Sequence, residues 1–169
     1  MSGGPDVTPA APAVPPGFHP VPMGGGFIAA NGPLWVLHEL RPEGPLVKLG
    51  FRVEPRHCNP MGMCHGGMLA SFCDMLLPIS VHRKSAEVGR RFLPTVSLQL
   101  DYMAPVPLGA WVEGEADVLK VTHTMVFAQG LVRADGQVAV RCSGVFKIGP
   151  KFGDDAPSPP VPVSSAPPA

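Results

Sequence analysis

The 169-residue chain has no excess of charge of either sign, and it has no long hydrophobic run. Lysine and arginine number 13, aspartate and glutamate also number 13, and charged residues make up only 15% of the chain. Without a basic stripe to hold a phosphate backbone, a nucleic-acid partner is not expected. No apolar run approaches the ~20 residues that cross a bilayer, so no membrane span is expected either.

The N-terminus also lacks the basic and apolar regions of a secretory signal. We therefore predict a cytoplasmic protein. In that compartment Cys58, Cys64, Cys73 and Cys142 are expected to be reduced thiols.

Proline, glycine and alanine dominate both ends of the chain. Residues 1–32 and 151–169 carry few large apolar side chains, and such segments gain too little from burial to offset their ordering entropy. We predict two flexible tails there. A single domain at 33–150 remains, which is long enough to bury a substantial core.

Alternation of polar and apolar side chains predicts strands through most of this domain. Asp135-Gly136 is a hairpin signal between two of them, because glycine tolerates a positive φ. The expected strands are Leu34–Leu40, Pro45–Glu54, Thr95–Met103, Trp111–Leu119, Thr124–Ala134 and Gln137–Ile148.

One segment has helical spacing instead, from Gly66 to about Arg83. Its apolar positions are Met68, Leu69, Phe72, Met75, Leu76 and Ile79. Pro78 inside it cannot donate to the carbonyl of Asp74, so a local bend is expected. One long helix among six strands favours an α+β architecture in which the helix packs on a strongly curved, mostly antiparallel sheet.

The segment "HCNPMGMCHGG" (residues 57–67) contains several residue types that bind metals or act as nucleophiles. Zinc ligands usually come in spaced pairs, whereas these Cys and His residues form adjacent couples with no second cluster. Sequence neighbours such as Cys64 and His65 tend to point apart, which disfavours a Cys–His nucleophile. A metal is therefore not expected, and the cysteines are interpreted as small apolar side chains.

Without the cysteines, the pattern is Asn59-x-x-Gly62-x-x-His65-Gly66-Gly67, with Asp74 nine residues after the histidine. Free N–H groups where Gly66 and Gly67 open the helix would suit a developing oxyanion. Asp74 lies ~12 Å further along the helix, too far to act on the same carbonyl within one subunit. A second copy of the chain could supply its own Asp74.

This pattern, together with "VSLQLDYMAPVPLGAWVEGEADVLK", resembles the hotdog-fold acyl-CoA thioesterases of the PaaI-like type, over about Leu34–Ile148. The resemblance implies a helix wrapped by a six-stranded sheet, a dimer with a shared sheet, and often a homotetramer. It implies that Gly66 polarises the thioester carbonyl and that the partner's Asp74 is base or nucleophile. Asn59 and His65 match orienting polar residues, and Ser97 matches a position that helps to place the attacking water in some members of the family.

The expected function is therefore hydrolysis of an acyl-CoA to a free acid and CoA. No cofactor is expected, because CoA is part of the substrate and a thioester is already a good acyl donor. Gly67 and Met68 are candidates to line the substrate site. The candidates to hold the CoA phosphates are Arg83, Lys84, Arg90 and Arg91. The alternative is a non-catalytic acyl-CoA-binding protein on the same fold. A hotdog dehydratase is less favoured, since no second carboxylate is placed for it.

Overall fold

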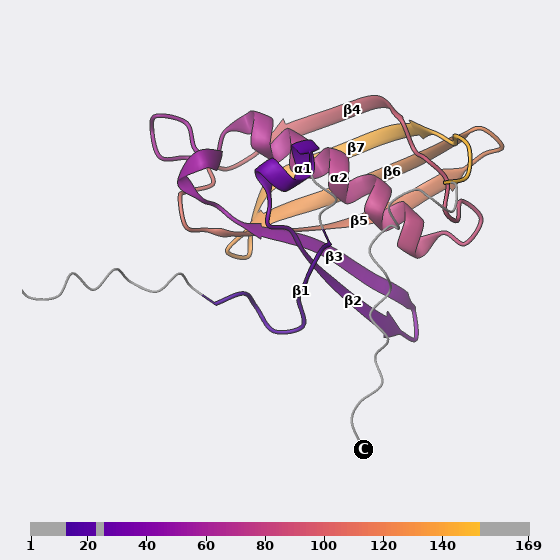
Figure 1. The fold of residues 1–169 in the computed structure, drawn as a ribbon, viewed down its shortest axis with the longest axis horizontal. Helices are drawn as coiled ribbons and strands as arrows, with labels where there is room; N and C mark the ends of the chain where they lie inside the picture. The colour runs from indigo at the N-terminus through magenta and orange to yellow at the C-terminus, as the bar shows by residue number, and fades with distance from the viewer. Residues whose placement is uncertain (1–12, 23–25, 153–169) are drawn as a thin grey trace, which may run out of the picture.

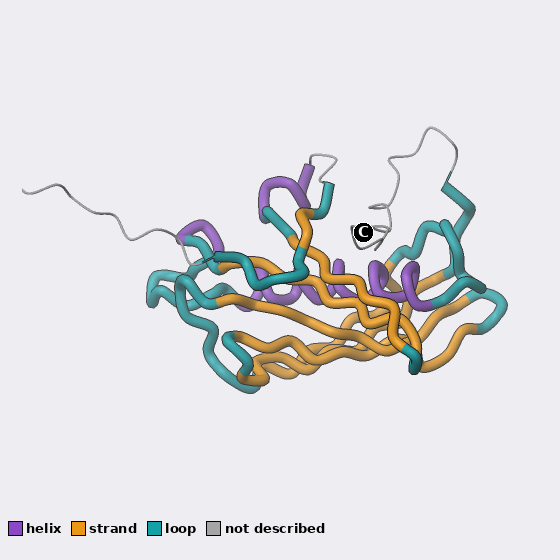
Figure 2. The backbone as a smooth tube through the Cα atoms, turned by 90° about the horizontal axis from the view of Figure 1, so that it is seen from below, coloured by secondary structure: helices purple, strands orange, loops and turns teal. Residues whose placement is uncertain are grey.

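A single antiparallel sheet with one long helix across its face forms the body of the molecule (Figures 1 and 2). The computed structural model describes residues 13–22 and 26–152. Its elements are β1 (His19–Pro20), α1 (Gly26–Asn31), β2 (Trp35–Arg41), β3 (Gly44–Arg52), a 3₁₀ turn (Pro55–His57), α2 (Gly66–Lys84), β4 (Thr95–Tyr102), β5 (Trp111–Val121), β6 (Met125–Ala134) and β7 (Gln137–Lys147). The strand order is β1-β2-β3-β5-β6-β7-β4.

The predicted α+β architecture is confirmed, with one difference in the sheet. The six expected strands are present within two residues of their expected ends, and α2 spans Gly66–Lys84. The sheet has seven strands rather than six because the two-residue β1 pairs with β2, His19 opposite Val36 and Pro20 opposite Trp35. A pairing this short leaves no period-two pattern in the sequence from which it could be predicted.

The upstream segment contributes to the packing. Phe18 and Val21 are buried, and the Phe18 ring meets the Trp111 ring edge-on with centroids 5.1 Å apart. The folded part therefore extends upstream of residue 33, where we expected it to begin. Of the two predicted tails, residues 1–12, 23–25 and 153–169 lie outside the described part of the chain.

Glycines in the sheet let α2 lie close against it. A Cβ at Gly114 in β5 would lie 2.4 Å from Leu76 Cδ2 and 3.1 Å from Phe72 Cε1. Both side chains are fully buried, so neither has room to move away. The apolar stripe read from the sequence is thus the face of α2 that packs on the sheet. Within the described ranges, no helix is long and apolar enough to cross a membrane.

Local turn chemistry fixes the β6–β7 hairpin. Asp135 (φ 46°) and Gly136 (φ 85°) both have positive φ, as a tight two-residue hairpin turn requires. The Asp135 carboxylate accepts a hydrogen bond from the Trp111 N–H at 2.9 Å, which ties the turn to the start of β5. The predicted turn is confirmed.

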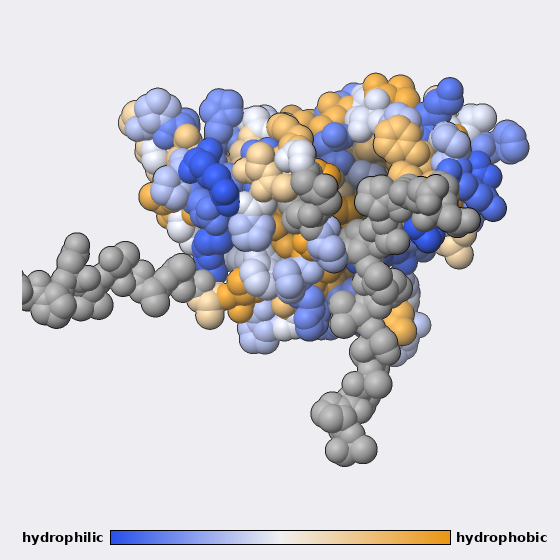
Figure 3. Space-filling model, in the orientation of Figure 1, coloured by the Kyte–Doolittle hydropathy of each residue, from blue (hydrophilic) through white to orange (hydrophobic). Residues whose placement is uncertain are grey.

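Strand β4 forms the edge of the sheet and pairs with β7 only, among the strands described. It exposes large apolar side chains, among them Val96 with 58% of its surface accessible and Tyr102 with 53%. In Figure 3, apolar side chains reach the surface along the upper edge, where β4 lies. An exposed edge with apolar side chains is a surface suited to pairing with another strand.

Candidate active site

Helix α2 begins with a backbone N–H that has no acceptor among the residues described. His65 is the N-cap, and its Nδ1 accepts a hydrogen bond from the Gly67 N–H at 2.9 Å. Its carbonyl accepts the Met68 N–H at 2.9 Å, so the second and third helical N–H groups are satisfied. The first, that of Gly66, is not. Such a group is electropositive and can donate to a developing oxyanion.

Two side chains hold this helix start. The Tyr102 hydroxyl donates to the Gly66 carbonyl at 2.9 Å. A neutral His65 ring carries one proton, and because Nδ1 accepts a hydrogen bond, that proton is on Nε2. The exposed His65 ring can then donate from Nε2 while it caps the helix.

Asn59 organises the loop that precedes the helix. Its Oδ1 accepts the backbone N–H of Met61 at 2.9 Å and of Met63 at 3.2 Å, a side-chain turn typical of asparagine. Gly62 has φ 72° in the same loop, a conformation that favours glycine. The structure therefore shows Asn59 bound to its own loop. Its expected role as a catalytic residue stays a prediction.

Asp74 lies beside a cavity of about 580 Å³. The cavity is mainly apolar and is assembled from distant parts of the chain: α1 contributes Phe27, α2 contributes Pro78, and the end of the described chain contributes Phe152. The Thr95 hydroxyl, at the start of β4, donates to Asp74 Oδ1 at 2.7 Å. This bond fixes the orientation of the carboxylate.

Thr95 was not among the residues predicted for the site, whereas Ser97 was. The register of β4 on β7 shifts between these two positions, with Thr95 opposite Phe146 and Ser97 opposite Val145. A bulge of this kind re-aims side chains at the end of a strand. Ser97 is half-buried and makes no side-chain hydrogen bond within the described residues, so its role as a water-positioning residue stays a prediction.

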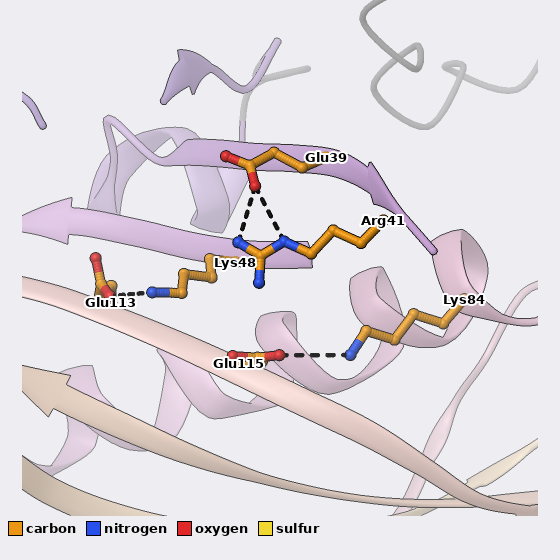
Figure 4. Close-up of polar contacts among 6 residues, drawn as sticks. All are labelled: Glu39, Arg41, Lys48, Lys84, Glu113 and Glu115. Carbon is orange, nitrogen blue, oxygen red and sulfur yellow. Dashed lines mark hydrogen bonds and ion pairs between the residues drawn. The ribbon is translucent and has the colours of Figure 1, made fainter. Parts of the chain in front are cut away.

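The predicted binding residues have different surroundings. Met68 is buried in the core, whereas Gly67 is exposed. Arg90 is exposed, and Arg91 donates from Nη1 to the Gly149 carbonyl at 3.3 Å. Lys84 lies 3.9 Å from a Glu115 carboxylate oxygen (Figure 4) and 3.4 Å from one of Asp117.

A second cavity, of about 440 Å³, lies on a charged part of the sheet. It is lined by Lys48, which pairs with Glu113 at 2.6 Å (Figure 4), and by Arg133 and Arg141. Arg141 in turn pairs with Asp101 at 2.6 Å. The Lys48 and Arg141 charges are thus already paired, which makes this cavity a weaker candidate than the one beside Asp74.

The cysteines have the properties of buried thiols. Burial, and then the proximity of Cys58, raise the pKa of Cys64 to about 12. A hydrogen bond with Cys142, together with burial, raises the pKa of Cys73 as well. Thiols with raised pKa values are poor nucleophiles at neutral pH. Among the described residues, no three His, Cys, Asp or Glu side chains gather to hold a metal.

Residues 61–140, from the loop before α2 to the middle of β7, match the sequence model of the thioesterase superfamily. This match covers 80 of the 169 residues, so the chain is similar to the superfamily over just under half of its length. A Pseudomonas aeruginosa protein with a provisional esterase name is 27% identical over 135 residues, which cover 80% of this chain and 97% of that protein. Mouse acyl-coenzyme A thioesterase 13 is 32% identical over 80 residues, covering 46% of this chain and 54% of its own length.

Solved structures of the superfamily have the same fold. Zebrafish thioesterase superfamily member 2 aligns with a TM-score of 0.63 and 24% identity over 73% of this chain and 87% of its own. A mutant of the phenylacetic acid degradation protein PaaI from Thermus thermophilus aligns with 0.58 and 24%, over 72% and 97%. A Bacillus halodurans protein solved with CoA gives 0.58 and 22%, over 68% and 74%. The chain therefore has the hotdog fold of these structures.

Proposed function

We propose that the chain is an acyl-CoA thioesterase whose active site is shared between two copies. The Gly66 N–H of one copy polarises the thioester carbonyl, and Asp74 of the other acts as base or nucleophile. The observation that carries the proposal is the unsatisfied N–H at the start of α2. An oxyanion donor of this kind stabilises the tetrahedral intermediate that forms when a thioester is attacked.

The separation of the two groups supports a shared site. Gly66 and Asp74 lie on the same helix eight residues apart, ~12 Å along its axis, whereas reacting groups act across about 3 Å. A second α2 running antiparallel to the first would bring Asp74 of one copy to Gly66 of the other. Edge strand β4 packs beside α2 and, among the described strands, pairs on one side only. It offers the sheet edge through which two copies would join.

Asp74 is suited to its role by its hydrogen bond. The Thr95 hydroxyl donates to Asp74 Oδ1 at 2.7 Å. The second carboxylate oxygen is then available to accept a proton from water or to attack the carbonyl carbon. The apolar cavity beside it would accept the acyl group. In hydrolysis, water adds to the carbonyl and the CoA thiolate leaves and takes up a proton. The groups on the chain are sufficient, and no cofactor is required.

CoA itself would extend to the protein surface. Arg90 is exposed and makes no ion pair with any described residue, whereas the charge of Lys84 is shared with Glu115 and Asp117. We therefore propose Arg90 rather than Lys84 as a phosphate contact. The Bacillus halodurans neighbour solved with CoA supports this class of ligand for the fold.

Mixing two inactive variants tests the shared site. Asp74→Asn removes the carboxylate, and Gly66→Pro removes the N–H. Each variant alone should lose turnover. Co-expressed with different affinity tags, they should regain about a quarter of the wild-type activity, because half of randomly paired dimers are mixed and each mixed dimer has one intact site of two. The readout is thiol released from a panel of short, long and aromatic acyl-CoAs.

The same panel separates the enzyme from a binding protein. Wild-type protein that binds acyl-CoAs without releasing thiol would favour the non-catalytic alternative. Mixed dimers that form, as shown by tandem purification, yet remain inactive would place the site within one subunit. Retained turnover in Asp74→Asn would remove the carboxylate from the mechanism.

A further inference from the structure

Cys58 and Cys64 face each other across a short antiparallel bridge just before the helix start. Backbone hydrogen bonds of 2.8 and 2.7 Å flank the pair, and neither of these bonds involves the cysteines themselves. They join the Asn59 N–H to the Met63 carbonyl, and the His65 N–H to the His57 carbonyl. Positions enclosed in this way are the close, non-hydrogen-bonded pairs of an antiparallel ladder, whose Cα atoms lie ~4.5 Å apart.

We propose that Cys58 and Cys64 form a thiol–disulfide pair that a low-molecular-weight disulfide oxidises. A disulfide needs Cα atoms about 4.4–6.8 Å apart and Cβ atoms directed at each other. Directly opposite residues of a ladder meet both conditions, because their side chains leave the same face. Both thiols are free in the structure.

The different exposure of the two thiols sets the order of events. Cys58 is half-buried, and its Sγ donates only a long hydrogen bond, 3.5 Å to the Glu54 carbonyl. Cys64 is 6% exposed. The thiolate of Cys58 attacks one sulfur of the external disulfide, and the released thiolate takes up a proton. The Cys64 thiol, held opposite the mixed disulfide, loses its proton as it attacks Cys58 Sγ and displaces the second external thiolate, which takes up a proton. Two protein thiols are oxidised to one disulfide, and one external disulfide is reduced to two thiols.

A second pair of cysteines provides a comparison within the same chain. Cys73 in α2 and Cys142 in β7 are also close enough to share a hydrogen bond. Their exposed fractions are 0% and 1%, so an external disulfide cannot reach either of them in the folded protein. In both pairs the two cysteines lie close together, but only the first pair includes a thiol that an external disulfide can reach. Oxidation of the folded chain should therefore select Cys58 and Cys64.

The bridge lies next to the proposed site, so oxidation has a consequence that rests on the proposed function. Cys64 precedes His65, which caps α2 and sets the position of the Gly66 N–H. The Cβ atoms of opposite residues lie about 4.5–5.5 Å apart, against about 3.8 Å in a disulfide. Closing that difference moves the loop by about 1 Å, and a displacement of that size can cost up to about 10²-fold in rate. We expect turnover to fall by on the order of tenfold.

Mapping the oxidised thiols tests the proposal. Reduced, folded protein is incubated with oxidised glutathione, unfolded, alkylated with N-ethylmaleimide and digested with trypsin. Cys58, Cys64 and Cys73 share one tryptic peptide, 57–83, which contains no internal lysine or arginine. Fragmentation should show that Cys73 and Cys142 are alkylated and that the 57–83 peptide has lost two hydrogen atoms across residues 58–64.

Single-cysteine variants serve as matched controls. Cys64→Ser should retain glutathione on Cys58, because the second thiol is absent, and Cys73→Ser should oxidise as the wild type does. Four alkylated cysteines after oxidation, glutathione left on Cys58 of the wild type, or a bridge that includes Cys73 would each overturn the proposal.

The activity measurement is independent of this map. Oxidised wild type is compared with reduced wild type and with Cys58→Ser treated in the same way. Unchanged turnover after complete oxidation would overturn the effect on the site. A reduced protein that hydrolyses no thioester would count against the proposed function, and the alkylation map would still decide the disulfide.

Discussion

Replacement of Gly66 by proline removes one hydrogen-bond donor and leaves the helix that carries it. Gly66 is the first residue of α2, the position at which proline is best tolerated because its missing N–H has no partner within the helix. The residue before a proline must be extended, and His65 already is, with φ −63° and ψ 138°. A Cβ at position 66 would lie 3.5 Å from the Tyr102 ring, an ordinary contact distance.

The expected effects on folding and on catalysis therefore differ sharply. Proline at a compatible first helical position changes stability by about 1 kcal/mol or less. Loss of one oxyanion donor costs about 10²–10³ in kcat, or about 2.7–4 kcal/mol of transition-state stabilisation. Gly66→Ala is the matched control, because it adds the Cβ and keeps the N–H. We expect Gly66→Pro to retain its melting temperature within a few degrees and to lose kcat relative to Gly66→Ala.

The assay is thiol release from the best substrate of the acyl-CoA panel, with a thermal melt of each variant. A kcat for Gly66→Pro within tenfold of Gly66→Ala, in protein that melts normally, would refute the assignment of this N–H as the oxyanion donor. An equal loss in both variants would show that the added side chain, and not the missing N–H, is responsible.

Three further predictions follow from particular contacts. Thr95→Val should lower kcat by on the order of tenfold because it removes the hydrogen bond to Asp74, while Thr95→Ser, which keeps the hydroxyl, should stay close to wild type; equal rates for the two would exclude an orienting role. Gly114→Ala should destabilise the fold by about 1–3 kcal/mol in urea unfolding, and the loss should be smaller in a Leu76→Ala background, where the clashing methyl group is absent; simple additivity would contradict the packing argument. Burial, and then the nearby guanidinium of Arg56, lower the pKa of His57 in the folded chain below its ordinary value of 6.5. Below pH 6.5 the unfolded chain therefore binds more protons at His57 than the folded chain does. Stability should therefore be complete above that pH and fall as the pH drops below it, and His57→Gln should flatten this dependence in urea melts taken from pH 7.5 to 5; an unchanged slope would assign the loss to other groups.

Much of the fold could be predicted because its signals are local. Helix α2 was predicted from apolar spacing, and its start from the pattern His65-Gly66-Gly67, and both are confirmed. The β6–β7 turn depends only on Asp135 and Gly136, whose positive φ values are a property of those residue types. β1 was missed because a two-residue strand has no periodicity, and it exists only because β2 is there to pair with it.

In the candidate site, too, the local features could be predicted and the contacts between distant segments could not. Gly66 and Asp74 lie on one helix and His65 caps it, so their relative positions follow from helix geometry and could be read from the sequence. The bond from Thr95 to Asp74 spans 21 residues and depends on the bulge in β4. The Cys58–Cys64 pairing likewise depends on the register of two short segments, which residue spacing alone does not fix.

The sequence by itself thus determined which elements form and which groups open the helix, because backbone preference and side-chain period act between near neighbours. The tertiary structure decided which side chain orients the carboxylate, which segments line the cavity and which two cysteines face each other. Those contacts join residues far apart in the chain, and their partners are set by strand register and by how closely α2 packs on the sheet.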